Sequence, residues 1–122
     1  MEKKQLQLKI EQQEERIREI KAKDSESNFL IRDLQRVYKQ QEAILEEILY
    51  YSKGTEAEHS ARQLLQQLDE ERREAFRTFE HGKEELSELV NESERARDQA
   101  EEDLLWLRKK EQEEKEDKDG KI

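Results

Sequence analysis

Ser52-Lys53-Gly54-Thr55 is the only clear turn pattern in this chain, and it separates two long apolar stripes of similar length. Gly54 can adopt the left-handed conformation that ends a helix, and Thr55 followed by Glu58 has the spacing of a capping box that begins the next one. The sequence therefore predicts an all-α fold, a long antiparallel two-helix hairpin that is coiled-coil-like, with helices at about 2–51 and 56–110 and a turn at 52–55. A single glycine can also lie inside one continuous helix, so an unbroken rod is the alternative.

Each expected helix carries apolar residues at alternating spacings of three and four, the pattern of a coiled-coil contact line. Nine of the thirteen positions are apolar in each helix. The first set is Leu6, Ile10, Gln13, Ile17, Ile20, Asp24, Ser27, Ile31, Leu34, Tyr38, Gln41, Leu45 and Ile48. The second set is Leu65, Leu68, Arg72, Ala75, Phe79, Gly82, Leu86, Leu89, Ser93, Ala96, Ala100, Asp103 and Leu107.

Composition favours such a thin contact line over a globular core. The chain has 122 residues, of which 31% are hydrophobic and 47% charged, and it contains no proline. This polarity is too high for a core of ordinary thickness, whereas the abundant Glu, Gln, Lys, Arg and Leu favour helix. Nine of the twelve residues 111–122 are charged and only the last is apolar, so we expect an acidic disordered tail there.

The charge and the missing residue types restrict location and partners. A net charge of −9 disfavours nucleic acid and anionic membrane surfaces, and no apolar run is long enough for membrane insertion. The absence of cysteine fits a reducing cytoplasm, and no cleavable leader follows Met1. We therefore expect a cytoplasmic protein, with export alongside a cargo left open.

If the helices fold back about residues 53 and 54, residue i faces about residue 107 − i, so 84–103 lie beside 4–23. The first of these segments carries a net charge of −7 and the second +2. A parallel homodimer would bring two segments of −7 together, so the charges favour the hairpin. Residues 24–28 interrupt the first stripe opposite 81–83, and we expect a bend or a short break there.

Two regions hold more apolar side chains than one contact line can use, and we predict that they bind a partner. Either they complete a homodimeric four-helix bundle, or they form a groove for a different helical protein. The predicted contact residues are Phe29, Leu30, Val37, Ile44, Leu49, Tyr50, Tyr51, Leu104, Leu105 and Trp106.

The sequence indicates no enzyme, cofactor site or metal site. His59 and His81 are the only histidines, and without cysteine they are better read as solvated helix residues than as ligands. The thirty-three acids lack the deep apolar pocket that raises a catalytic carboxyl pKa, and no nucleotide-binding or triad motif is present. Arg72 and Arg73 lie among acids, which is typical of a salt-bridged helix face.

Near its C-terminus the chain contains the segment Glu102-Asp103-Leu104-Leu105-Trp106-Leu107-Arg108-Lys109. In this segment, in its length, in its acidic helical hairpin and in its lack of Cys and Pro, the chain resembles the small helical proteins encoded beside LXG toxins of the bacterial type VIIb secretion system. Those proteins are related in shape to the WXG-type hairpins. The chain departs from the WXG pattern at the turn, where Tyr51-Ser52-Lys53-Gly54 replaces Trp-x-Gly, and Tyr38 and Glu42 match the spacing of the Tyr-x-x-x-Asp/Glu tail only in mid-helix.

Phe29-Leu30-Ile31-Arg32-Asp33 has the spacing of a Phe-x-x-x-Asp export motif in a companion group, which adds Asp33 to the predicted partner-binding residues. The alternative for this pair is that Phe29 belongs to the contact line and Asp33 to the surface. The resemblance implies a targeting factor or chaperone that binds the N-terminal helical domain of a cognate LXG toxin in the cytoplasm. The runner-up function is a self-associating structural coiled coil, such as the stalk-like hairpin of an export apparatus.

Overall fold

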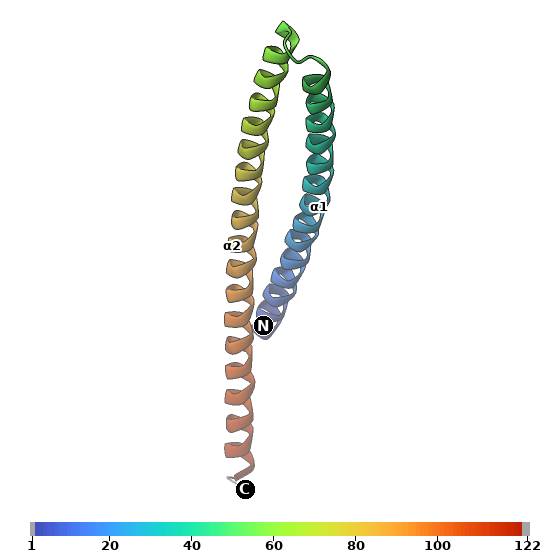
Figure 1. Ribbon diagram of the computed structural model, residues 1–122. Helices are drawn as coiled ribbons and strands as arrows, with labels where there is room; N and C mark the ends of the chain where they lie inside the picture. Colours follow the sequence, from blue (N-terminus) through green and yellow to red (C-terminus); the bar gives the residue numbers. More distant parts are fainter. Residues whose placement is uncertain (1, 121–122) are drawn as a thin grey trace. The chain divides into compact units, whose positions relative to one another are not determined.

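The computed structural model describes residues 2–120 of the chain, and within them it contains two helices and no strand (Figure 1). Helix α1 spans Glu2–Tyr51 and helix α2 spans Glu56–Gly120. The fold is therefore the all-α helical hairpin that the sequence predicts, and its turn occupies the expected residues 52–55. Within this described part, neither helix is apolar over a stretch long enough to cross a bilayer.

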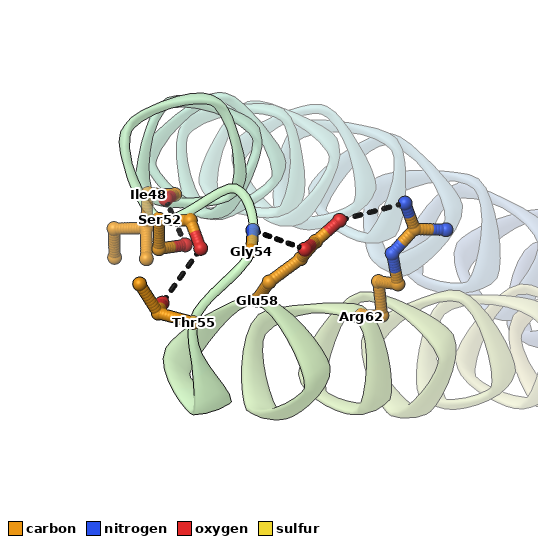
Figure 2. Close-up of polar contacts among 6 residues, drawn as sticks. All are labelled: Ile48, Ser52, Gly54, Thr55, Glu58 and Arg62. Atoms are coloured by element: carbon orange, nitrogen blue, oxygen red, sulfur yellow. Dashed lines mark hydrogen bonds and ion pairs between the residues drawn. The ribbon is translucent and has the colours of Figure 1, made fainter.

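Gly54 makes the turn possible, because its φ of 82° lies in the left-handed region that side chains disfavour. On the α1 side, the Ser52 N–H and hydroxyl both donate to the Ile48 carbonyl, at 3.0 and 2.5 Å. The turn then closes through Thr55, whose N–H and hydroxyl both donate to the Ser52 carbonyl, at 3.0 and 2.6 Å (Figure 2). These bonds use carbonyls that the end of α1 would otherwise leave without partners.

The predicted capping box forms only in part. Glu58 reaches back over the start of α2, but its Oε2 accepts a hydrogen bond from the Gly54 N–H at 2.7 Å rather than from Thr55 (Figure 2). Thr55 directs its hydroxyl to Ser52 instead of to the first turn of α2. Arg62 holds the other oxygen of the Glu58 carboxylate, at 3.1 Å. The carboxylate therefore links the turn to the first turns of α2.

The chain divides into two compact units, and both helices run through both of them. Unit 1 comprises the residues up to Ala22 and those from Leu86 onward, and unit 2 comprises Lys23–Glu85. The boundary in α1 falls beside residues 24–28, which interrupt the apolar stripe in the sequence. No break in the helix occurs there, contrary to one form of the sequence expectation, because the polar residues 24–28 are still compatible with helical backbone.

In unit 1, the first turns of α1 pack antiparallel against the later part of α2 (Figure 1). Ile17 and Ile20 are the buried residues of α1, and Ser93, Ala100 and Leu104 are buried on α2. Small residues on α2 facing large ones on α1 allow the two helices to approach closely. Lys3 and Glu111 form an ion pair at the far end of this packing.

In unit 2, the packing is thinner and more polar. Ala61 and Leu68 are its buried residues, and the rings of Tyr38 and Phe76 meet at 6.5 Å between centroids. Arg72 connects the helices through an ion pair with Glu42, whose atoms are 3.7 Å apart, and also binds Asp69 at 2.6 Å. Arg73 joins the same Asp69 at 3.1 Å, so the predicted salt-bridged helix face is present.

The register between the helices differs from the sequence expectation. The contacting pairs Lys3–Glu111, Glu42–Arg72 and Tyr38–Phe76 have residue numbers that add up to 114 rather than 107. The offset arises at the turn, where the first turn of α2 stands beyond the last turn of α1 (Figure 1). A shift of about one heptad still places apolar residues opposite each other, since the stripes repeat every seven residues.

The shift weakens the electrostatic argument for the hairpin. Residues 4–23 now face about 91–110, which carry six acids and five bases and hence a net charge of −1 instead of −7. Within the described side chains, Lys3–Glu111 and Arg72–Glu42 are the ion pairs between the helices. Apolar packing and the turn therefore account for the hairpin better than charge does, because each exposed ion pair stabilises by less than about 1 kcal/mol.

Helix α2 does not end near residue 110, as the sequence suggested, but continues to Gly120. Residues 108–117 are all exposed, which agrees with the composition of this segment. Their backbone is helical because Glu, Gln and Lys have favourable helix propensity even without packing. Residues 121 and 122 of the expected tail lie outside the described part of the chain.

Candidate partner-binding surface

Helix α1 carries two heptad stripes in unit 2 rather than one. The first faces α2 and is half-buried; it contains Ile31, Tyr38, Glu42, Leu45 and Leu49. The second, which we call the outer stripe, consists of Leu30, Leu34, Val37, Gln41, Ile44, Ile48 and Tyr51. Its spacings alternate between four and three, so its members lie along one face of the helix. All seven are exposed, and six of them are apolar or aromatic.

Three residues of the outer stripe were assigned to the helix contact by the sequence. Leu34, Gln41 and Ile48 fit the heptad set that was expected to face α2, but all three are exposed. Tyr38 and Leu45 are half-buried as expected, but Glu42 and Leu49 are covered in place of Gln41 and Ile48, which lie one residue earlier in each case. A residue lies 100° from the next around a helix, so a one-residue shift is enough to move a side chain out of the contact. The assignment was wrong at these positions.

A groove lies beside the outer stripe at residues 41–45, where α1 meets α2. It is lined by Gln41, Ile44, Leu45, Leu64, Gln67, Leu68 and Glu71. Ile44 is 57% exposed and Leu64 49% exposed, so apolar surface from both helices is open to solvent at the same place. Leu64, which the sequence did not single out, extends the apolar surface across to α2. The geometry suits a helix lying along the groove, as in other helix-in-groove complexes.

Acidic side chains border this surface. Asp33 and Glu47 are two heptads apart on the exposed side of the outer stripe, and both are exposed. Across the groove, Glu71 and Glu74 lie seven and ten residues after Leu64 on α2, and both are also exposed. Arg36 forms an ion pair with Asp33, and their atoms are 3.8 Å apart. The border of the groove is therefore more negative than positive.

The turn end of α1 adds aromatic surface. Tyr50 and Tyr51 are exposed, and their rings meet edge to face with centroids 5.2 Å apart. The Lys53 ammonium lies 5.2 Å from the centre of the Tyr50 ring. Leu49, in contrast, is half-buried on the side that faces α2, so its prediction as a free contact residue is only partly compatible with the structure. Tyr51 is the last member of the outer stripe.

The predicted contact residues near the end of α2 separate into two groups. Leu104 is 7% exposed and belongs to the packing between the helices, so it is not available to a partner, contrary to the prediction. Its burial follows from the spacing Ala100, Leu104, Leu107, which places Leu104 on the α1-facing side and leaves Asp103 exposed. Leu105 and Trp106 are exposed at 68% and 60%. This surface belongs to unit 1, and the Lys110 ammonium lies 4.9 Å from the Trp106 ring.

Phe29 and Asp33, the pair with export-motif spacing, are both exposed on α1. Phe29 is 66% exposed, so the alternative that placed it in the helix contact is wrong. Asp33 is a surface residue that interacts with Arg36. Whether the pair acts as an export motif stays a prediction.

The surface chemistry elsewhere is that of a salt-bridged helical protein. Among residues 2–117, no three acidic or histidine side chains converge to form a metal-binding group. The hydrogen bond from the Gly54 N–H, aided by Arg62, lowers the pKa of Glu58. The hydrogen bond to Asp98 raises the pKa of Arg97. Both shifts stabilise the ionised forms of surface groups, and neither prepares a group for proton transfer.

Comparison with protein-family models, with curated proteins and with solved structures finds no match for this chain. The resemblance to LXG-associated helical proteins therefore stays a prediction that rests on the residues quoted above.

Proposed function

We propose that this protein is a non-enzymatic helical adaptor, or targeting chaperone, that binds the N-terminal helical domain of a cognate LXG toxin in the cytoplasm for type VIIb secretion. The observation that carries the binding role is the outer stripe, six exposed apolar or aromatic side chains at heptad spacing beside a groove. The resemblance of the sequence supplies the class of partner.

The exposed apolar area supports a binding role on energetic grounds. Complete burial of one large apolar side chain stabilises a complex by about 1.5–3 kcal/mol, and the outer stripe offers five aliphatic side chains and one tyrosine. Association costs about 4–15 kcal/mol in lost translational and rotational freedom. The six apolar members are 36–78% exposed, so each contributes only part of that value, and a stable complex requires most of the stripe to be covered. Contiguous apolar surface of this kind is typical of interaction sites.

Co-purification with a toxin domain tests the proposal. The chain and the N-terminal helical domain of an LXG toxin encoded beside it are co-expressed and analysed by size exclusion with light scattering. We expect a stable complex with the unchanged chain and none with the double variant Val37→Gln, Ile44→Gln. Both residues are exposed, so the variant should fold normally.

A matched control is Leu8→Gln, which removes another exposed apolar residue from α1 but lies in unit 1. This variant should retain the complex. The proposal fails if the two proteins, each folded by circular dichroism, form no complex, or if the double variant binds as well as the unchanged chain.

A self-associating structural coiled coil is the second candidate, and one feature of the outer stripe favours it. In an antiparallel pair centred on Gln41, Leu34 would face Ile48 of the second copy and Val37 would face Ile44. The stripe is thus complementary to itself in its apolar pattern. Sedimentation velocity at several concentrations separates the candidates, because a monomer at every concentration contradicts self-association.

A further inference from the structure

We propose that the outer stripe and the adjoining face of α2 bind a single amphipathic helix of about three heptads, whose positions flanking its apolar stripe carry lysine or arginine. The inference rests on the proposed adaptor function and specifies the chemistry of the partner helix. The proposed occupant of the surface is a basic helix of another protein and not a second copy of this chain.

The length of the partner helix follows from the outer stripe itself. The stripe begins at Leu30 and ends at Tyr51, which corresponds to about three heptads. N-terminal to Leu30, the same spacing continues to Ser27 and Lys23, which are polar, so the apolar surface stops there. At the other end α1 terminates at Tyr51. A partner helix of this length would cover the apolar surface without extending over charged residues.

The middle of the stripe is polar. Gln41 lies between Val37 and Ile44 and also lines the groove. An amide in an otherwise apolar contact favours a partner that places a polar side chain at the same level, because an unpaired buried amide is costly. A single polar layer also fixes the register of a helical pair. We therefore expect one Asn, Gln or similar residue near the centre of the partner's apolar stripe.

The charge of the border selects a basic partner. Asp33 and Glu47 flank the stripe on α1, and Glu71 and Glu74 flank the groove on α2. The exposed arginines nearest in sequence to Glu71 and Glu74 are Arg73, which binds Asp69 at 3.1 Å, and Arg77. Arg36 and Arg77 offset two of the four acids, which leaves the border negative. Lysine or arginine on both flanks of an incoming helix would meet this border with opposite charge.

The same charges oppose a second copy. In the antiparallel pair centred on Gln41, Asp33 would lie opposite Glu47 of the other copy, and the symmetry of the dimer repeats this contact. Each chain also carries a net charge of −9. Like charges across a helical contact disfavour pairing, so the apolar pattern permits a homodimer but the flanking charges do not favour it.

Two synthetic peptides of about three heptads test the inference. Both have Leu and Ile in the apolar stripe and one central Asn. One carries Lys at all flanking positions, and the other carries Glu there. Repulsion between the flanking residues, which all carry the same charge within one peptide, keeps each peptide from pairing with itself. Fluorescence anisotropy of the labelled peptides should show that the Lys peptide binds the chain at least about tenfold more tightly, since four exposed ion pairs of modest strength add up to that preference.

Charge-reversed variants locate the effect. Glu47→Lys with Glu71→Lys should abolish the preference for the Lys peptide. Glu101→Lys with Glu102→Lys changes the net charge by the same amount on exposed residues of unit 1 and should retain it. Val37→Gln with Ile44→Gln leaves the net charge unchanged. This variant should bind the Lys peptide at least about tenfold more weakly, because the apolar contact is lost.

Several results would overturn the inference. These are equal affinity of the two peptides, equal effects of the two charge reversals, or no binding of either peptide. If neither peptide binds and the chain sediments as a dimer that Val37→Gln with Ile44→Gln dissociates, a second copy occupies the stripe. A toxin domain that binds through Val37 and Ile44 without charge preference would refute this inference alone. Peptide binding as expected with no binding of the toxin domain would refute the proposed function alone.

Discussion

Leu104 and Leu105 are consecutive leucines of α2 in the same unit, and their substitution by alanine tests which side of the helix packs against α1. Leu104 is 7% exposed and Leu105 is 68% exposed. Leucine to alanine removes three carbon groups, each contributing about 0.8 kcal/mol when fully buried. Leu104→Ala should therefore lower the free energy of unfolding by about 2 kcal/mol, and Leu105→Ala by about 0.8 kcal/mol or less.

The magnitude for Leu104 lies near the low end of the range for buried leucines because the contact is one layer deep. Neighbouring side chains and water can fill the space, so little is added for a cavity. Urea unfolding followed by circular dichroism at 222 nm measures both variants and avoids the fluorescence of the adjacent Trp106. Equal destabilisation by the two substitutions, or a larger effect at Leu105, would refute the assignment of the contact face.

Three further predictions concern the turn and the helix contact. Gly54→Ala should lower the free energy of unfolding by about 1–2 kcal/mol in urea titration, because its φ of 82° is strained for any side chain although nothing blocks a Cβ sterically. Glu58→Gln should destabilise the protein at pH 7, but progressively less as the pH falls below 4.5, the ordinary pKa of the group. The pKa of Glu58 is lowered in the folded protein, so its carboxylate stabilises the fold above the unfolded pKa, and this stabilisation is lost on protonation. Thermal midpoints of both proteins across pH 3–7 check this. Ala100→Leu should destabilise unit 1 by about 1–3 kcal/mol, because Ala100 is 1% exposed and a larger side chain would push the helices apart, whereas Ala43→Leu at an exposed site should be neutral within about 0.5 kcal/mol.

The sequence was sufficient for the hairpin because its turn depends on one residue type at one position. Gly54 is the residue that adopts positive φ, and on either side of the turn α1 ends and α2 begins where the pattern placed them. The register was missed by about a heptad for a physical reason. Two stripes that repeat every seven residues match equally well after a shift of seven, and the geometry of the turn, which decides between the matches, does not appear in the pattern.

The exposed apolar residues of α1 lie in the segment that the sequence singled out, but several of them occupy a different side of the helix from the one expected. Two stripes overlap between Leu30 and Tyr51, so Leu34 and Ile48 fitted the α2-facing set although they belong to the outer stripe. At the other end, four consecutive apolar residues allowed two frames, one with Asp103 and one with Leu104 facing α1. Only the partner helix decides between such frames, because periodicity alone gives the width of an apolar band and not which part of it is covered.

Spin labels on the outer stripe report directly whether a partner helix covers it. Since the chain contains no cysteine, a nitroxide attached to Gln41→Cys reports on the stripe alone, and one attached to Gln99→Cys, an exposed position in unit 1, serves as the control. Electron paramagnetic resonance spectra are recorded before and after addition of the toxin domain. If a partner helix covers the stripe, the label at position 41 becomes immobilised and the label at position 99 does not change; a label at 41 that stays mobile in a formed complex would show that the stripe is not the binding surface.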